Sequence, residues 1–238
     1  MSELARAAQE LGHEIVAVAP DVYIQRGWRY EHQAIAALNK CPTIVAEWGY
    51  FDRVSSKENG YSGHWQLSIG GLNQLPQGEF PPDRFNATGC KLIERKPVKG
   101  YALLCGQVAV DAAVQGIDHK AWLQHQYNDI SVNGYEVRYR KHPRGGVDLD
   151  GVESSTASLA EDLAGAAFLV CYNSNVGHDA LLAGVPVICD QTAPYHELSG
   201  FTLPSRAKRL AYFSRAAYGQ WRASEAVEGL AATLARLS

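Results

Sequence analysis

AFLVCYNSNVGHDALLAGVPVICD, residues 167–190, is the stretch that decides the fold of this chain. Residues 168–171 form a short apolar run typical of a buried parallel strand, and residues 185–189 form a second one. The turn-forming residues 172–175, followed by an apolar segment that ends at Gly184, predict a turn and a helix between the two strands. Strand, helix and strand in this order predict a right-handed β-α-β unit.

The turn before this helix is a candidate anion site. Ser174, Asn175 and the backbone amides of Val176 and Gly177 lie at the expected helix N-terminus, where a partial positive charge attracts phosphate. A serine at such a turn often only caps its own helix, so this turn alone leaves both interpretations open.

Length and composition narrow the class of protein. At 238 residues and 26.0 kDa, the chain can form one large α/β domain or two small ones. A net charge of −3 argues against a generally basic nucleic-acid binder. The five cysteines are dispersed without a C-x-x-C pair, which predicts free thiols in a reducing compartment. The sequence contains neither a signal peptide nor an apolar run long enough for a membrane span, so we expect a cytoplasmic protein without a membrane partner.

The first half of the chain predicts a small α/β unit. Apolar spacing predicts a helix that closes at Gly12, a strand over 13–19, a helix over 29–38 and a strand over 43–47. The sequence begins with a helix, so the strand that would open this unit is missing from it. Either the sequence is trimmed at this end or the sheet naturally lacks that strand. Residues 54–84 are rich in glycine, proline and polar residues and predict long loops.

The pattern resets near residues 96–100, where we place a domain boundary. The second half predicts strands at 101–105 and 136–140, a helix at 118–127 and a capping box at 158–161. Helices over 205–219 and 224–237 are expected to finish the chain. The predicted domains are 1–96, 97–204, and a C-terminal helical segment, 205–238, that crosses back to the first domain.

Strand ends in the second half carry polar and basic groups. Gly106, Gln107 and Asp111 follow one strand, and RKHPR with His142 and Arg144 follows another. Arginine and lysine would add charge-assisted bonds to an anion bound at the Ser174 turn, and we expect the RKHPR strand to neighbour that turn. Alternatively, His142 is only a strand-end histidine packed by Pro143.

These motifs resemble those of a known enzyme group. An Arg-x-His-Pro strand end paired with a later Tyr-Asn-Ser turn resembles the His-Pro and Ser motifs of GT-B glycosyltransferases, including capsule-polysaccharide and sialyl-type transferases. A second resemblance covers most of the chain and is to phage-encoded glycosyltransferases associated with hydroxymethylated pyrimidines in DNA. It is carried by VAEWGYFDR, SIGGLNQ, LLCGQVAVDAAVQG, YRKHPR, SLAEDLAGA, YNSNVGHDALLAGVPV and RLAYFSRAAYGQW.

The resemblance implies an α/β, GT-B-like fold with two Rossmann-like lobes around a cleft, the first lobe being reduced. It implies a nucleotide-sugar donor in the second lobe, a UDP-sugar in preference to a CMP-sugar, and no cofactor besides this donor. The D-x-D at 148–150 is interpreted as a solvated turn, so no metal ligands are assigned. Asp111 and Glu47 are the candidate catalytic carboxylates. The donor-side candidates are Gly106, Gln107, His142, Arg144, Ser174, Asn175, Val176, Gly177 and Glu197, and the acceptor-side candidates are Arg53, Trp48 and Tyr50.

The acceptor implied by the phage resemblance is a hydroxymethylpyrimidine in double-stranded DNA, with the enzyme in the host cytoplasm. Basic residues that could contact DNA include Arg26, Arg206 and Arg209. The alternatives are a capsule or surface-glycan glycosyltransferase, a sugar-nucleotide 2-epimerase-like enzyme, and a nucleotide- or DNA-binding protein without turnover. Stereochemistry and oligomeric state stay open at this point.

Overall fold

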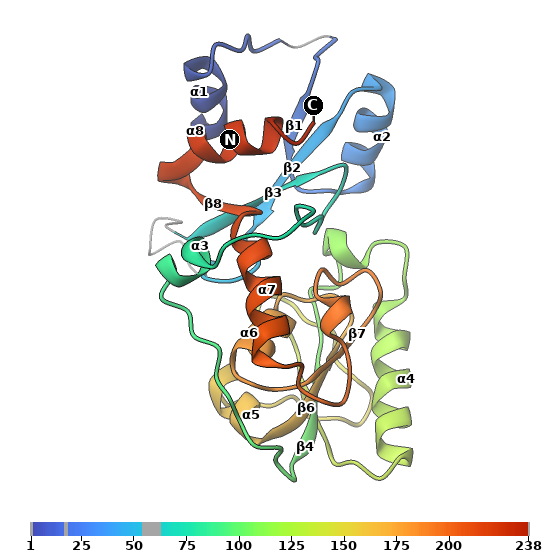
Figure 1. Ribbon diagram of the computed structural model, residues 1–238. Helices are drawn as coiled ribbons and strands as arrows, with labels where there is room; N and C mark the ends of the chain where they lie inside the picture. The colour runs from blue at the N-terminus through green and yellow to red at the C-terminus, as the bar shows by residue number, and fades with distance from the viewer. Residues whose placement is uncertain (1, 17–18, 54–62, 238) are drawn as a thin grey trace. The chain divides into compact units, whose positions relative to one another are not determined.

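A computed structural model of the protein describes residues 2–16, 19–53 and 63–237 (Figure 1). The chain divides into two compact units, Met1–Gly89 with Ala211–Ser238, and Cys90–Leu210. Each unit has its own four-stranded sheet. No helix of the described part of the chain is long and apolar enough to cross a membrane.

The division differs from the domain boundaries expected at 96/97 and 204/205. Arg95 donates hydrogen bonds to the carbonyl groups of Leu163 and Ala166, which ties residues 90–96 to the second unit. The buried Arg209 does the same for residues 205–210, because its guanidinium donates to the carbonyl of Leu181 at 2.9 Å. The sequence does not reveal these long-range bonds, so it placed both boundaries a few residues away.

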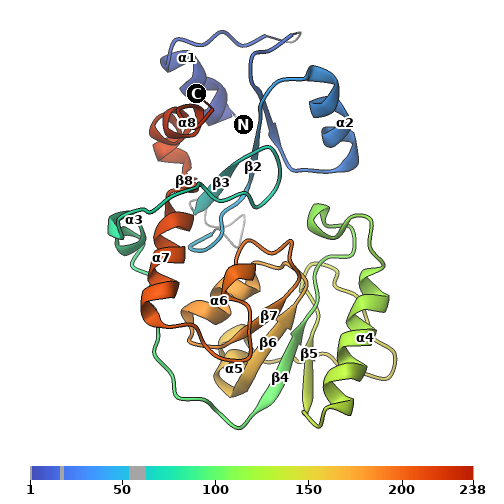
Figure 2. The ribbon, with the colours of Figure 1, turned by 45° about the vertical axis from the view of Figure 1, so that its right-hand side comes forward.

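The second unit is a parallel α/β sheet. Its strands run in the order β5-β4-β6-β7, with β4 at Tyr101–Cys105, β5 at Val137–Arg140, β6 at Ala166–Cys171 and β7 at Val187–Cys189. Helix α4 lies on one side of this sheet and helices α5 and α6 lie on the other (Figure 2). These helices span His119–Val132, Leu159–Gly165 and Val176–Leu182.

This strand order contains a topological switch point. The chain leaves β4 toward β5 on one side and then returns to place β6 on the other side of β4. In open parallel sheets, ligands bind outside the carboxyl ends of the strands where the direction of winding reverses. The crevice between the ends of β4 and β6 is therefore where the fold favours a ligand.

The expected β-α-β unit is present in the second unit. Ser158 and Glu161 form the predicted capping box, and helix α6 begins at Val176 as expected. Gly184 follows helix α6 with a φ of 76°, a left-handed conformation that glycine adopts without strain. A Cβ atom at this position would also lie 2.6 Å from the carbonyl oxygen of Ile93. Glycine is thus required both by the turn and by the close approach of the chain.

The first unit has a mixed sheet in the order β1-β2-β3-β8. Strands β1 and β2 are parallel, and β3 is antiparallel to β2 and to β8. Helices α1 and α8 pack together on one side of this sheet, and α2 lies on the other (Figures 1 and 2). The strands are Tyr23–Arg26, Thr43–Trp48, His64–Ile69 and Gln220–Arg222, and the helices are α1 at Ser2–Glu10, α2 at Tyr30–Asn39, α3 at Asp83–Ala87 and α8 at Ala226–Leu234. Helix α7, Arg206–Ala217, begins in the second unit and ends in the first.

Two expectations for the first unit are wrong. Residues 13–16 form no strand, and Ile15 and Val16 are 55% and 45% exposed, because β1 takes the edge position beside β2 instead. Residues 17–18 of that expected strand lie outside the described residues, and Ala19, with a φ of 51°, is not in a strand. The stretch expected to be long loops contains β3 and α3, because β3 pairs with β2 and β8 over long sequence distances.

Three cysteines lie side by side in the second sheet. Cys105, Cys171 and Cys189 end β4, β6 and β7 and pair in register, and all are free thiols. Burial raises the pKa of Cys171 to about 12 and that of Cys189 to about 11. In the first unit, burial likewise raises the pKa of Tyr50 to about 12.

These shifts predict alkaline destabilisation. The folded state holds the groups protonated, whereas thiols of the unfolded chain ionise near pH 9, so the unfolded state binds fewer protons above that pH. Their contribution to stability is complete below about pH 9 and is lost as pH rises toward the folded values, at about 1.4 kcal/mol per pH unit for each group. Urea unfolding from pH 8 to 11 should show this loss, and Cys171→Ala should reduce its slope. A slope that Cys171→Ala leaves unchanged contradicts the assignment to this thiol.

Candidate functional site

Four strand ends of the second unit meet at one edge of its sheet. Because β4, β5, β6 and β7 are parallel, the segments that follow them share this carboxyl edge. These segments contain most of the predicted donor-side residues. They are Gly106 and Gln107 after β4, residues 141–144 after β5, residues 172–177 after β6 and residues 190–192 after β7.

Gln107 and Asn173 lock the ends of β4 and β6 together. The Gln107 side-chain amide donates to Asn173 Oδ1 at 2.9 Å, and the Asn173 backbone amide donates to Gln107 Oε1 at 3.1 Å. Asn173 Nδ2 also donates to the carbonyl of Ala113 and to Thr192 Oγ1. Both side chains are almost completely buried. Gln107 therefore holds together the segments that follow β4 and β6, and its side-chain amide group is hydrogen-bonded to Asn173.

His119 is a candidate that the sequence reading missed. It is the first residue of helix α4, and the residue is 4% exposed. Its Nε2 accepts a hydrogen bond from the Gln107 backbone amide at 3.1 Å, which places the ring proton on Nδ1. Nδ1 has no hydrogen-bond partner among the described residues. Burial lowers the pKa of His119, so the ring is neutral near pH 7.

An unpartnered buried donor at a switch point is a strong sign of a ligand site, because leaving such a group unsatisfied costs about 1–3 kcal/mol. The sequence held one hint. His119 directly follows Asp118, the residue that caps helix α4 by accepting from the Ala121 amide. The first helix after the strand at the switch point begins beside the ligand edge, so a histidine there merits attention.

Aromatic rings line His119 on the same edge. Trp122 is parallel to the imidazole at a centroid distance of 5.9 Å, and Tyr172 meets Trp122 edge-on at 5.3 Å. Rings in such an arrangement offer flat apolar surface next to the Nδ1 donor. This edge therefore combines apolar area with a few convergent polar groups, as small-molecule sites do.

The Ser174 turn differs in part from the expected anion cradle. Ser174 Oγ accepts from the Val176 amide at a long 3.4 Å, and the Gly177 amide donates to the Ser174 carbonyl at 3.0 Å. The Gly177 amide is consequently not available to a phosphate in this structure. Gly177 serves packing instead, since a Cβ atom there would lie 2.1 Å from the ring of Tyr195. Asn175 is the N-cap of helix α6 without a side-chain capping bond.

The basic strand end after β5 is partly committed to internal ion pairs. Arg138 and Arg140 both contact the buried carboxylate of Asp162, at 3.4 and 2.9 Å. Lys141 pairs with Asp148 at 2.8 Å. His142 Nδ1 accepts from the Arg144 backbone amide at 3.1 Å, and Arg144 is exposed.

The RKHPR strand is not the immediate neighbour that we expected. β4 lies between β5 and β6, so the RKHPR end and the Ser174 turn are two strand spacings apart, about 10 Å. Adjacent pairing could not be inferred from chain order, because β5 precedes β6 in sequence but pairs with β4. A ligand that touches both ends has to span the end of β4.

The remaining polar candidates of the second unit lie at the surface. Asp111 is exposed and accepts from the Ala113 amide at 2.9 Å, capping a short 3-10 helix. Glu197 is an exposed residue of the 3-10 turn after β7. Asp148 and Asp150 of the D-x-D are 80% and 81% exposed and pair with Lys141 and Lys120. Within the described residues, no group of three or more His, Cys, Asp or Glu is placed to hold a metal ion.

The predicted residues of the first unit have different environments. Glu47 is the penultimate residue of β2, and a Cβ atom at Gly27 would lie 3.7 Å from Glu47 Oε2 and equally close to the ring of His32. Trp48 stacks on Trp65 with a centroid distance of 4.7 Å. The partly buried Arg53 donates to the carbonyl of Tyr50 at 3.3 Å.

Tyr50 is a core residue in this structure. Its side chain is fully buried and hydrogen-bonds to Ser68 Oγ and the carbonyl of Gln74. The Gln220 side-chain carbonyl accepts from the Tyr50 and Phe51 amides, which folds the turn inward and carries the ring into the core. The sequence places Tyr50 just after a strand end but cannot show this inward turn.

Comparison with solved structures places the fold beside two sugar transferases. Thermosulfurimonas dismutans KpsC, beta Kdo 2,4 transferase, matches with a TM-score of 0.66 at 16% identity over 93% of this chain and 88% of that chain. Thermosulfurimonas dismutans KpsC, beta Kdo 2,7 transferase, matches with a TM-score of 0.55 at 16% identity over 96% of this chain and 88% of that chain. No protein-family model and no curated protein matches the sequence. The chain has the mixed α/β fold of these transferases, with two sheets.

Proposed function

We propose that the protein is a glycosyltransferase that moves a sugar from a nucleotide-sugar donor to a hydroxyl group of a glycan. The observation that carries this proposal is the switch-point edge of the second unit, where an unpartnered buried His119 donor lies beside aromatic rings and two polar strand ends. The fold shared with the two Kdo transferases supports the same assignment.

The donor nucleotide is a UDP or a CMP group held at this edge. Trp122 and Tyr172 would pack against its apolar surface, and His119 Nδ1 would donate to one of its oxygens. The diphosphate or phosphate would reach from the Ser174 hydroxyl toward His142 and Arg144, and the two-strand spacing matches an extended ligand better than a single compact anion. Charge on the leaving nucleotide would be stabilised by Arg144 without a metal ion. Glu197 is proposed to bind a ribose hydroxyl.

A glycan is the preferred acceptor over DNA. Both structural neighbours are named as transferases of a sugar, and one of the basic residues considered for DNA, Arg209, is completely buried. Glycosylation of hydroxymethylpyrimidine DNA, and epimerisation of the donor without transfer, are the outcomes that would overturn the glycan assignment.

Nucleotide binding should depend on the residues of the edge. His119→Ala and Ser174→Ala are each expected to weaken binding by about 1–3 kcal/mol, the scale for losing a hydrogen bond to a charged group. Calorimetric titration with UDP and CMP measures this effect. His125→Ala, an exposed change on the same helix α4, is the matched control and should bind as the unaltered protein does. Equal affinities for all variants would contradict this site.

The metal requirement and the acceptor are tested with the same protein. Binding is expected to persist after treatment with a chelator, and complete loss restored by manganese would instead point to Asp148 and Asp150. Panels of UDP- and CMP-sugars, with glycans or hydroxymethylated DNA as acceptors, then identify the product by mass spectrometry. Product that forms only on modified DNA, or an altered donor sugar without acceptor, would exclude glycan transfer.

A further inference from the structure

Three tryptophans lie side by side across the sheet of the first unit. Trp48 of β2 is in register with Trp65 of β3, which is in register with Trp221 of β8. The Trp48 and Trp65 rings are stacked at 4.7 Å with an interplanar angle of 21°. By strand alternation they share a face with Ala46 and Leu67, the face whose core includes residues of α1 and α8.

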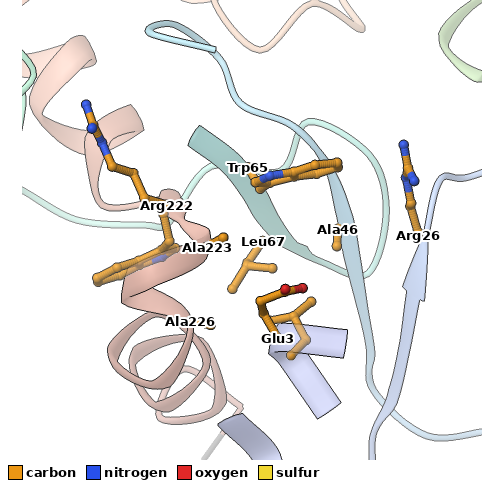
Figure 3. A pocket seen from close by; sticks show the side chains of 10 residues that line it. Glu3, Arg26, Ala46, Trp65, Leu67, Arg222, Ala223 and Ala226 are labelled. Carbon is orange, nitrogen blue, oxygen red and sulfur yellow. The ribbon is translucent and has the colours of Figure 1, made fainter. Parts of the chain in front are cut away.

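A cavity of about 310 Å³ opens on this same face. Figure 3 shows Trp65 on one side of it and Glu3 of α1 on the other, with Arg26 and Arg222 on opposite flanks. Most of the wall is apolar, and its charged groups are confined to these three side chains. The lining consists of Glu3, Leu4, Arg26, Ala46, Trp65, Leu67, Trp221, Arg222, Ala223 and Ala226.

Arg26 is an unusual member of this wall. Its guanidinium carbon lies 5.1 Å from the centroid of Trp65 and 5.8 Å from that of Trp48. No carboxylate of the described residues pairs with it, and its side chain is exposed. Arg222, by contrast, already pairs with Asp52 at 2.9 Å. Arg26 therefore presents a planar fork, oriented by two indoles, to an anionic group.

A second polar group in the wall lacks a partner. Trp221 is 7% exposed, and its indole N–H is buried without a hydrogen-bond acceptor among the described residues. The Glu3 carboxylate contributes acceptor oxygens from helix α1. The wall thus offers an aromatic face, a cation that no carboxylate of the described residues pairs with, and a carboxylate that also accepts from Ser2 Oγ at 2.7 Å.

We propose that this cavity binds a pyranose ring that carries a carboxylate. The ring's C–H face would stack on Trp65, its carboxylate would pair with Arg26, and its hydroxyl groups would donate to Glu3. The indole face can stack on a sugar ring, and the Glu3 carboxylate can accept hydrogen bonds from its hydroxyl groups. This combination suits a polyol better than a nucleobase, because the lining has no amide side chain to form paired hydrogen bonds with the edge of a base. The volume is at the small end of ligand sites, roughly 300–1,000 Å³, and fits one or two sugar rings.

This proposal rests on the proposed function, since it names the acid sugar as part of the glycan acceptor. It assigns Arg26, Trp65 and Glu3 as acceptor-binding residues, alongside Trp48 already considered for that side.

Binding of sugars to the whole protein tests the proposal. The probes are methyl pyranosides of glucuronate and galacturonate and N-acetylneuraminate, compared with the uncharged methyl glucoside, by saturation-transfer NMR and tryptophan fluorescence. At least one acid sugar should bind, at roughly tenfold or higher affinity than the glucoside. Arg26→Gln should weaken that binding roughly tenfold and remove the preference for the acid, and Trp65→Leu should reduce binding of both sugars.

Matched controls separate the local effect from misfolding. Arg6→Gln removes an exposed arginine of helix α1 that pairs with Glu10 at 3.5 Å, and should leave sugar binding unchanged. Circular dichroism and urea unfolding of each variant establish that it is folded. The proposal is overturned if no acid sugar receives saturation from the protein. It is also overturned if the Arg26→Gln variant binds the acid sugar as tightly as the unaltered protein does.

The nucleotide titration on the same samples distinguishes this proposal from the proposed function. UDP or CMP binding without sugar binding would remove the sugar site alone. Sugar binding with the expected Arg26 dependence, but without nucleotide binding, would support the cavity and contradict the transferase assignment.

Discussion

Asp162→Ala is expected to lower the free energy of unfolding of the second unit by about 3 kcal/mol. The Asp162 side chain is completely buried and holds Arg138, Arg140 and the hydroxyl of Ser155, the last at 2.8 Å. Removing the carboxylate leaves two arginine side chains beside a buried gap without their shared counter-charge. Because these arginines are 39% and 22% exposed, water can hydrate them in part, which keeps the loss near the lower end for buried pairs.

Urea unfolding monitored by circular dichroism measures this loss. Asp148→Ala is the matched control, since Asp148 forms an ion pair of similar length with Lys141 but is 80% exposed. That change should cost less than about 1 kcal/mol. If the two variants are destabilised equally, burial is not what makes Asp162 important. Because Arg140 directly precedes residues 141–144, Asp162→Ala should also weaken nucleotide binding.

Asp111→Asn is expected to reduce the rate of sugar transfer by about 10²- to 10⁴-fold, the range for loss of a general base. Asp111 is the proposed base that accepts the proton of the acceptor hydroxyl, and Glu47 is the alternative carboxylate. Asparagine can still accept the hydrogen bond from the Ala113 amide, so the 3-10 turn should survive the change. The measurement is the rate of nucleotide release at saturating donor, with Glu47→Gln assayed in parallel.

Asp118→Asn supplies a close control for this experiment. Asp118 is likewise exposed and caps a helix by accepting a backbone amide at 2.9 Å, but it belongs to helix α4. It should keep the full rate. A large loss in Glu47→Gln alone would transfer the role of base to Glu47, and full activity in both Asp111→Asn and Glu47→Gln would remove carboxylate base catalysis by these residues.

Local patterns predicted the second unit well. Strands β4, β6 and β7 are short apolar runs, and β5 alternates apolar and basic residues. Capping residues such as Asp118 and Ser158 mark where helices begin, so the sequence alone located these elements of the parallel sheet. The alternation of strands and helices also predicted that polar residues would gather at one carboxyl edge. Helix α6 and the turn at Gly184 were confirmed for the same reason.

Long-range pairing explains what the sequence did not predict. Strands β3 and β8 are held by partners distant in the chain, whereas residues 13–16, which include Ile15 and Val16, have no place in a sheet. The candidate site shows the same limit. His119 is a candidate site residue because its Nε2 accepts a hydrogen bond from the Gln107 amide while its Nδ1 has no partner among the described residues. Neither fact follows from the residue type.

The reactivity of the three cysteines that end β4, β6 and β7 can be used to measure how often the carboxyl edge of this sheet opens. Cys105 and Cys171 are buried, and Cys189 is partly exposed at the end of the row. Alkylating reagents can reach the inner thiols only when the sheet edge opens, so their labelling rates measure how often it opens. A nucleotide that bridges the loops above these strands should slow this labelling, whereas a sugar bound in the first unit should leave the rates of these three thiols unaltered. Mass spectrometry of peptides could then follow occupancy of the donor site without any added probe group.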